Sequence, residues 1–392
     1  MSNNKDQITY YFGAGASFNA IPCVEGLSFR LIDLSIYFQK VIDAIKSVIN
    51  IHPFDIDNDA KNLIETVNLN AEGFNFILMH LPSYVDELNW LIKESKNHQT
   101  IDTLAKRFSL TDDNESLLRL KKVLIIYFYF EQNIYFQSHS KKEEYEHKHE
   151  LFLDKRYDNL IASIAQRVER SIQLNPNVNF ISWNYDLQIE YALKNYFYKK
   201  NQTINYIKNR NNIYPFRFDI IKQLDYDISK FGTYKLNGSA YLDVKLNDEH
   251  MRNVYDLRYD QDDLKPIDFI YEFIKYAEDS FKRNVNLDYL LFSWEEKNKF
   301  QDEIVKAAAE VMKRTKILII IGYSFPFFNS RIDKYILNEC TPDEIIIEDY
   351  QANVIWERLK TLVPNFKKTI YKNKVSFKIP SGTFSIHPDI ES

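Results

Sequence analysis

The chain has 392 residues, of which 45% are hydrophobic, so it is long and apolar enough to form one large or two ordinary globular domains. Its 50 Lys and Arg residues stand against 55 Asp and Glu residues, a formal net charge of −5, and no stretch concentrates basic residues, which argues against direct nucleic-acid binding. The longest apolar runs, Val123–Phe130 and Ile317–Ile321, are shorter than the ~20 residues that a membrane-spanning helix needs.

Cysteine usage indicates a reducing compartment. Cys23 and Cys340 are far apart and form no CxxC pair, so neither a disulfide framework nor a structural zinc ribbon is predicted. No secretory signal is predicted either, because Gly13–Ser17 interrupt the first apolar run and no small-residue cleavage site follows. We therefore expect a cytoplasmic protein with no membrane association.

The first predicted element is an apolar strand, Ile8–Phe12, which runs into the glycine turn Gly13-Ala14-Gly15-Ala16-Ser17. Such a turn begins many nucleotide-binding α/β domains, because glycine lets the backbone approach a pyrophosphate and the amides of the following helix start offer an anion site. Phe18 stands where dinucleotide dehydrogenases need a third glycine, so an ordinary NAD-dependent dehydrogenase is disfavoured. A glycine-rich turn without a ligand is the alternative interpretation.

A long, mostly helical stretch is predicted from about Leu27 to Gln173. Apolar residues recur in it at three- and four-residue spacing, which is typical of helices with one buried face. They include Leu31, Leu34, Phe38, Val41, Ile42 and Ile45. No parallel strand is evident in this stretch.

Further strand-and-turn units follow. Asn177–Trp183 is predicted as a buried strand, followed by Asn184-Tyr185-Asp186 and a helix that carries Ile189, Leu193 and Phe197. Residues 200–232 are polar and predicted to be irregular, and Tyr234–Leu236 is a short predicted strand that ends at Asn237-Gly238-Ser239.

The last third of the chain continues the alternation. Pro266–Arg314 is predicted to be helical, and the strand Lys316–Ile321 enters the turn Gly322-Tyr323-Ser324-Phe325-Pro326. A final strand, Glu344–Ile347, ends at Glu348 and Asp349 and precedes a helix over Ala352–Leu362.

Strands that alternate with helices predict an α/β fold with a Rossmann-like parallel sheet, and ligands bind beyond the carboxyl ends of such strands. No repeat or low-complexity linker divides the chain, so we predict one domain over residues 1–392 with large helical insertions. The predicted core covers about 7–30, 155–199, 230–245 and 310–380, and the insertions cover about 31–154 and 246–310.

Four motifs stand in order along the chain: GAGAS at 13–17, WNYD at 183–186, KLNGS at 235–239 and GYSFP at 322–326. Together they resemble the motifs of the sirtuin-like (silent information regulator two) family, and within it those of the bacterial antiviral branch that degrades NAD. The resemblance covers the predicted strand ends, whereas the insertions match only in being helical. It implies the sirtuin-like form of the Rossmann fold.

The resemblance also implies a role for each motif. It assigns Gly13, Ala14, Gly15 and Ser17 to the NAD phosphates, and Asn184 and Asp186 to the nicotinamide ribose and the attacking water. It assigns Asn237 to the position of the family's catalytic base and Gly238 to the NAD-binding residues beside it. Gly322 and Ser324 would contact the adenosine ribose or phosphate, and Glu348 or Asp349 would be near the other ribose.

Two departures from the family pattern matter. The zinc-ribbon cysteines of the lysine-deacylating sirtuins are absent, which disfavours protein deacylation, and no metal site is predicted. The family's catalytic histidine is replaced by Asn237, which cannot accept a proton at neutral pH. General-base assistance, worth ~10²–10⁴-fold, would then be missing. Hydrolysis remains chemically feasible, because glycoside-type cleavage passes through an oxocarbenium-like state that water can capture with little deprotonation.

By resemblance, the expected function is that of an NAD hydrolase that cleaves the nicotinamide–ribose bond to give nicotinamide and ADP-ribose, with NAD as substrate, in antiviral defence by abortive infection. Family members of this size are often encoded beside a HerA-like ATPase, so the resemblance also implies a homo-oligomer, such a partner and activation by it. The alternative is a non-catalytic subunit that binds NAD or ADP-ribose as sensor or scaffold. ADP-ribosyl transfer, and NADP or a cyclic ADP-ribose as ligand, also stay open.

Each motif also has a purely structural interpretation. Asn184 would cap the helix that follows, and Asp186 would complement the dipole of that helix. Asn237-Gly238 would form a tight turn, and Ser324 with Pro326 would mark a strand exit.

Overall fold

The computed structural model describes residues 6–21, 24–50, 69–134, 153–168, 171–197, 212–214, 227, 229–240, 266–282, 290–295, 299–364, 366 and 374–390. The chain forms two compact units. The sheet unit comprises Met1–Cys23, Leu153–Ser239 and Leu291–Ser392, and the helical unit comprises Val24–Phe152 and Ala240–Leu290. Cys23 itself lies outside the described residues.

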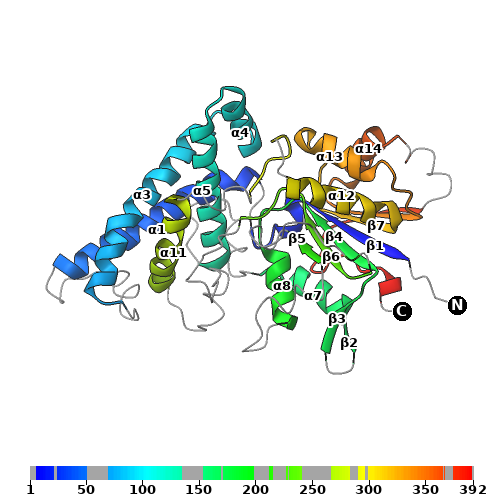
Figure 1. Ribbon diagram of the computed structural model, residues 1–392, viewed down its shortest axis with the longest axis horizontal. Coiled ribbons are helices and arrows are strands. Elements are labelled where there is room, and N and C mark those ends of the chain that lie inside the picture. The colour runs from blue at the N-terminus through cyan, green and yellow to red at the C-terminus, as the bar shows by residue number, and fades with distance from the viewer. Residues whose placement is uncertain are drawn as a thin grey trace. The chain divides into compact units, whose positions relative to one another are not determined.

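The sheet unit is built on a seven-stranded sheet with the order β5-β6-β4-β1-β7-β8-β9 (Figure 1). All neighbouring strands in it pair in parallel. The strands are β1 (Gln7–Phe12), β4 (Val178–Ser182), β5 (Asn212–Tyr214), β6 (Gly232–Lys235), β7 (Thr315–Ile321), β8 (Glu344–Glu348) and β9 (Lys374–Lys378). The predicted α/β class with a Rossmann-like parallel sheet and helical insertions is confirmed.

The strand order reverses at β1, which makes this strand the centre of the sheet. β4 lies on one side of β1, and β7, to which the chain returns much later, lies on the other. In open α/β sheets, ligands bind at such a reversal, beyond the carboxyl ends of the strands. The loops that follow β1, β4 and β7 are therefore where a ligand is expected to bind.

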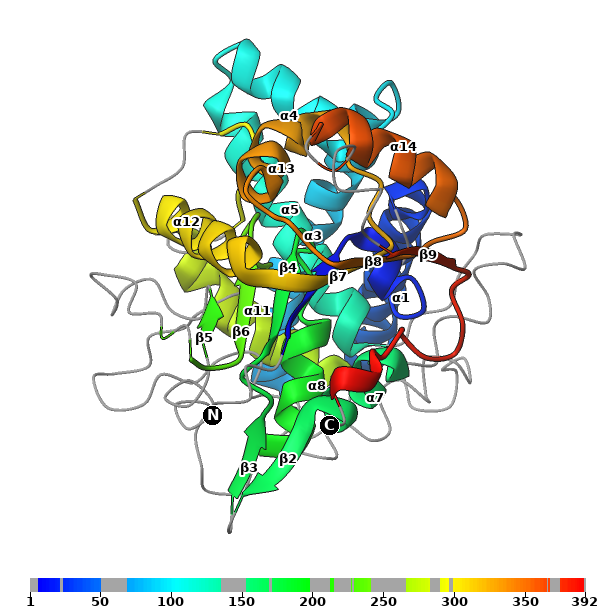
Figure 2. The same cartoon turned by 90° about the vertical axis from the view of Figure 1, so that its right-hand side faces the viewer.

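Helices cover both faces of the sheet, with α7 and α8 on one face and α12, α13 and α14 on the other (Figure 2). Their bounds are α7 (Lys155–Ile164), α8 (Gln188–Phe197), α12 (Lys299–Arg314), α13 (Ser330–Leu337) and α14 (Ala352–Leu362). Strand side chains alternate between the two layers: Tyr10 and Phe12 pack toward α7 and α8, whereas Tyr11 packs toward α12 and α13. Short 3-10 helices, η1 (Ala14–Ser17), η3 (Phe327–Asn329) and η4 (Pro388–Ile390), complete the unit.

The helical unit contains α1 (Val24–Asn50), α3 (Ala71–Ser95), α4 (Ile101–Leu110), α5 (Asn114–Asn133) and α11 (Pro266–Lys282). The apolar residues that predicted the first helix are all buried on α1, at exposures of 2% or less. Nearly the whole run Val123–Phe130 on α5 is buried as well, which explains its length: α5 contacts α1, α3 and α4.

Four of the described strands differ from the elements that the sequence predicts. An antiparallel hairpin, β2 (Ala165–Val168) and β3 (Ser171–Leu174), replaces the end of the predicted helical stretch, and β5 lies within residues 200–232, which were predicted to be irregular. β9 was also not predicted. Among the described strands β5 and β9 are the two edges of the sheet, and edge strands need no continuous apolar run because only one side is paired.

The predicted helical piece Pro266–Arg314 consists of two helices that belong to different units. α11 belongs to the helical unit, whereas α12 belongs to the sheet unit, although most of α12 falls within 246–310, the range expected for the insertion. α12 packs on the sheet through Ile304, Ala308 and Val311, which join Tyr234 and Leu318 in one buried cluster.

Candidate functional site

The four motifs begin where four neighbouring strands end. GAGAS follows β1, WNYD follows β4, KLNGS begins at the last residue of β6, and GYSFP follows β7. Because β6, β4, β1 and β7 are consecutive in a parallel sheet, the four loops leave the same edge (Figure 1). This edge is the candidate site.

The first and last of these loops pack backbone against backbone. Gly13 donates its amide to Ile321 O at 3.1 Å, and Gly15 donates to Gly322 O at 3.0 Å. A β-carbon on Gly322, whose φ is +59°, would lie 2.4 Å from the nitrogen of Ala16. These glycines therefore have a structural role, which is to let the two loops touch.

This packing uses backbone amides that the sequence analysis expected to bind phosphate. The amides of Gly13, Gly15 and Ala16 each donate to a backbone carbonyl, and the turn continues as the short η1, while α1 begins only at Val24. The start of α1 agrees with the helical stretch predicted from about Leu27, so the amides beside the glycines belong to η1 and not to a long helix. Phosphate binding by this turn stays a prediction, with Ala14 as its exposed residue.

Ser17 is the centre of a buried polar cluster that joins three segments. Its Oγ accepts a hydrogen bond from Asn184 Nδ2 at 3.1 Å and lies 3.0 Å from the hydroxyl of Tyr157 on α7. Asn184 Nδ2 also donates to Gly13 O at 3.0 Å. The bond to the first amide of α8 is accepted by the side chain of Asp186. Both amide hydrogens of Asn184 are used, so it would contact a ligand through Oδ1.

Asp186 is 5% exposed and belongs to the same cluster. Burial raises the pKa of its carboxyl, while the charge of Lys235, the amide of Gln188 and the hydroxyl of Ser17 act to lower it. Its Oδ1 accepts from the amide of Gln188, the first residue of α8, at 3.1 Å. Asp186 thus makes the capping bond expected of Asn184, at the helix start where a carboxylate also complements the dipole. That role occupies only part of the carboxylate.

Lys235 and Tyr157 were not identified from the sequence. Lys235 is a buried lysine whose Nζ pairs with Glu190 of α8 at 2.8 Å. The signal was present in KLNGS, since a lysine at the end of a buried strand needs a partner. Tyr157 lies within a helical pattern that gives no indication of a polar contact to Ser17.

Asn237 is 5% exposed, and its Oδ1 has no hydrogen-bond partner in the described part of the chain. Its backbone carbonyl accepts from the amide of Leu291 at 2.9 Å, and Gly238, with a φ of +74°, closes a turn onto Lys235 O. The predicted tight turn is present. A buried carbonyl oxygen without a donor is costly, so a ligand hydroxyl or water would satisfy it.

The remaining predicted residues lie at the ends of β7 and β8. Ser324 is exposed, and its backbone carbonyl accepts from Arg358 at 2.9 Å. Glu348 is 1% exposed, and its Oε2 accepts from the amide and the hydroxyl of Ser385, each at 2.7 Å. Asp349 Oδ1 accepts from the amide of Gln351 at 2.7 Å. Ribose contacts by Ser324, Glu348 and Asp349 stay predictions.

Asp333 on α13 is another buried carboxylate, and it is bonded to side chains from β1 and from the loops that follow β4 and β7. Tyr11 and Trp183 donate to its Oδ1 at 2.6 and 3.0 Å, and Tyr323 donates to its Oδ2 at 2.7 Å. Burial raises the pKa of Asp333 to about 7, although these three donors act to lower it. Trp183 and Tyr323 belong to two of the four motifs, so this network fixes their relative positions.

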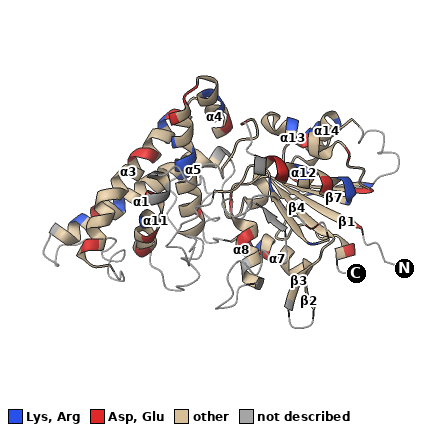
Figure 3. Ribbon diagram, viewed as in Figure 1, with Lys and Arg blue, Asp and Glu red and all other residues tan. Residues whose placement is uncertain are grey.

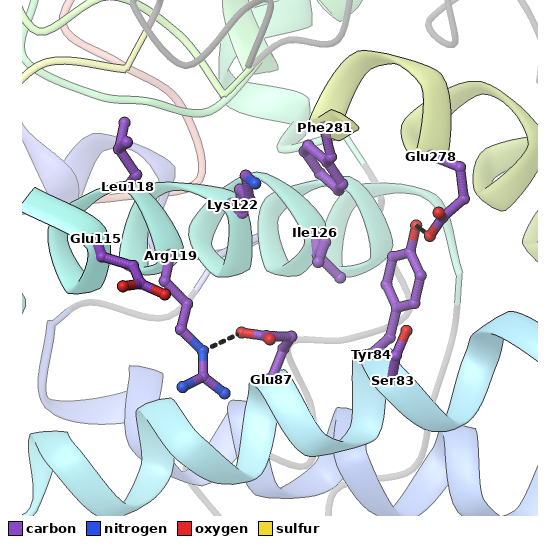
Figure 4. A pocket seen from close by; sticks show the side chains of 10 residues that line it. All are labelled: Ser83, Tyr84, Glu87, Glu115, Leu118, Arg119, Lys122, Ile126, Glu278 and Phe281. Carbon is purple, nitrogen blue, oxygen red and sulfur yellow. Dashed lines mark hydrogen bonds and ion pairs between the residues drawn. The ribbon is translucent and has the colours of Figure 1, made fainter. Parts of the chain in front are cut away.

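The helical unit contains a separate pocket of about 490 Å³ between α3, α5 and α11 (Figure 4). None of the predicted site residues lines it. Two lining interactions are polar: Arg119 donates to Glu87 at 2.6 Å, and the Tyr84 hydroxyl donates to Glu278 at 3.3 Å. Neither sign of charge dominates the lining.

Charge and metal-binding groups do not suggest a different site. Acidic and basic residues are interspersed along the drawn helices of each unit (Figure 3). Over the described ranges, no three His, Cys, Asp or Glu side chains gather as a metal ion would require. In the same ranges no helix has the length and apolarity needed to cross a membrane.

The fold and the site together define a three-layer α/β unit with a polar cluster at the carboxyl edge of a parallel sheet. A comparison with models of protein families and a comparison with curated proteins both find no match to this chain.

Proposed function

We propose that this protein binds NAD at the carboxyl edge of its sheet and hydrolyses the bond between nicotinamide and ribose. Four motif loops share this edge, which lies at the reversal of strand order where dinucleotides bind in comparable sheets. The observation that carries the proposal is the buried Oδ1 of Asn237, which has no hydrogen-bond partner among the described residues. Asn237 follows β6, the strand that pairs with β4, and Asn184 and Asp186 follow β4.

The residues divide the chemical work as follows. Asn184 Oδ1 and Asn237 Oδ1 accept hydrogen bonds from ribose hydroxyls or from the attacking water. Asp186 supplies negative charge where the ribose becomes positive as nicotinamide leaves. Asn237 stands where the resemblance expects a histidine base, so the rate depends on positioning and on this electrostatic environment.

A second candidate function is non-catalytic binding of NAD or ADP-ribose. It is favoured by Asn237 itself, which replaces the expected base, and by the amides of Gly13, Gly15 and Ala16, which donate to backbone carbonyls of the protein. A subunit of this kind would act as a sensor or scaffold.

Location and partners depend on the resemblance alone. On that basis we propose a cytoplasmic role in antiviral defence, in a homo-oligomer that associates with a HerA-like ATPase and is activated by it. In cells, the corresponding measurement would be a fall in the NAD content of lysates after infection.

The test is incubation of the purified protein, alone and with the product of the adjacent gene, with NAD, followed by chromatographic measurement of nicotinamide and ADP-ribose. We expect equimolar release, abolished by Asp186→Asn and retained by Asp302→Asn, a matched change of an exposed aspartate on α12. Binding of ADP-ribose without release in any assembly would favour the second candidate. Nicotinamide release with label on a macromolecule would indicate ADP-ribosyl transfer, and absence of binding would exclude all three.

A further inference from the structure

Lys235 is a charged side chain in the interior of the sheet unit. It is the last residue of β6 and is 1% exposed. A buried ammonium is costly unless its charge is paired and its protons are bonded, so the surroundings of Lys235 must compensate for its burial.

The Lys235 ammonium is fully bonded. Its Nζ donates to the backbone carbonyl of Asp186, to the Oγ of Ser239 at 3.1 Å and to the carboxylate of Glu190, whose Oε1 lies at 2.8 Å. An ammonium has three donors, and these acceptors use all of them. One side chain thus joins the WNYD loop, the KLNGS loop and α8.

The position of this charge matters most for Asp186. The charged or titratable groups that act on the Asp186 carboxyl come from three elements: Lys235 on β6, Glu190 on α8 and Tyr157 on α7. Lys235 is the one cation among them. Its charge lowers the pKa of Asp186, whereas burial and the charge of Glu190 raise it.

We propose that Lys235 is a positioning residue for Asp186: its ammonium holds the Asp186 backbone through the carbonyl oxygen and presents a buried positive charge to the carboxylate of that residue. The inference rests on the proposed function in one respect: the Asp186 carboxylate is taken to stabilise positive charge on the ribose. The arrangement itself is independent of catalysis.

The first experiment measures the coupling between the two residues without any substrate. Unfolding constants are determined in urea from pH 5 to pH 9 for the wild type, Lys235→Met, Asp186→Asn and the double variant. Without Lys235 the ionised Asp186 lacks its cation. We therefore compare the effect of Lys235→Met on the unfolding constant in two backgrounds, one with Asp186 and one with Asn at this position. At pH 8 we expect the increase to be at least tenfold larger in the background with Asp186. The excess should shrink toward pH 5 as Asp186 takes up a proton.

Two further variants keep the experiment interpretable. Lys316→Met makes the same change on β7 at an exposed lysine that lies 3.8 Å from Asp343, and we expect no coupling to Asp186. If Lys235→Met does not fold, Lys235→Met/Glu190→Leu replaces the whole buried pair by apolar side chains, a change that proteins often tolerate. The coupling is the ratio of the effects on the unfolding constant with and without Asp186, measured in whichever of these variants folds. A ratio below about threefold at all pH values would overturn the proposal, and a larger ratio supports it.

The second experiment uses the proposed activity. We expect the acid limb of the pH profile of nicotinamide release to move upward by at least one pH unit in the folded Lys235 variant, with kcat reduced more than KM is changed. If the wild type releases no nicotinamide, the proposed function fails while the coupling measurement still decides the role of Lys235. If release occurs and the acid limb does not move, the positioning role is wrong.

Discussion

The side-chain amide of Asn184 donates to the backbone carbonyl of Gly13 across 3.0 Å, although the two residues are 171 positions apart in the sequence. The same nitrogen donates to Ser17 at 3.1 Å. One asparagine therefore holds the glycine turn after β1 against the loop after β4. The same two hydrogen bonds therefore position the loops of the candidate site and contribute to the stability of the fold.

Asn184→Ala should affect both stability and the proposed activity. Gly13 O and Ser17 Oγ keep Ala16 N and the Tyr157 hydroxyl as partners, so the loss is that of two hydrogen bonds, and we expect the free energy of unfolding to fall by about 1–3 kcal/mol. Nicotinamide release should fall by about 10²–10³-fold, as for other lost oriented polar groups in active sites. Urea denaturation and chromatography measure the two effects. Asn195→Ala, an exposed asparagine on α8, is the control and should change neither.

Asn237→Ala should separate ligand binding from folding. Because Asn237 Oδ1 has no partner among the described residues, its removal should cost about 1 kcal/mol or less in unfolding free energy. Affinity for ADP-ribose, measured by calorimetry, should fall at least tenfold, which corresponds to one lost hydrogen bond of about 1.4 kcal/mol. Unchanged affinity with a large loss of stability would show that Asn237 is structural.

Gly322→Ala should destabilise the sheet unit strongly. At a φ of +59° an alanine costs about 1–2 kcal/mol, and its β-carbon would lie 2.4 Å from Ala16 N, so the loops after β1 and β7 must separate. We expect a loss of at least about 3 kcal/mol, measured by urea denaturation. Gly382→Ala is the matched control, because a β-carbon there meets no atom within 4 Å. It should stay within about 0.5 kcal/mol of the wild type.

Asp333→Asn should remove one component of the pH dependence of stability. Burial raises the pKa of Asp333 from 3.8 to about 7, so between these values the folded protein binds a proton that the unfolded chain releases. The free energy of unfolding therefore falls as pH rises from about 4 to about 7 and is constant above that, as far as this group is concerned. The asparagine side chain cannot titrate, so the variant should gain stability relative to the wild type over this range, by an amount of the order of a few kcal/mol.

The comparison of the two proteins at each pH removes contributions that they share. Glu131 in the helical unit also has a pKa raised to about 7, mainly by burial, and its effect is the same in both. Thermal or urea unfolding at several pH values gives the difference directly. A difference that does not vary between pH 4 and pH 8 would contradict the raised pKa of Asp333.

The inner strands and the four turns could be predicted because their signals are local. A strand that is buried on both faces needs a continuous apolar run, as in Ile317–Ile321, and the chain must then leave the sheet through residues such as Gly322. The edge strands β5 and β9 carry no such run and could not be predicted. α12 was predicted to be helical, but its periodic pattern does not tell to which unit it belongs, so the boundary of the second insertion could not be predicted.

The sequence by itself determined the α/β class, the central parallel strands and the turns that end them, because hydrophobic periodicity and glycine act over a few residues. Only the tertiary structure decided that Ser17 meets Asn184, that Gly15 packs on Gly322, and that Lys235 is buried against Asp186 and Glu190. Each of these pairs joins segments that are distant in the chain and close only after the sheet has formed. Burial then makes each polar group dependent on its partners, which no local pattern encodes.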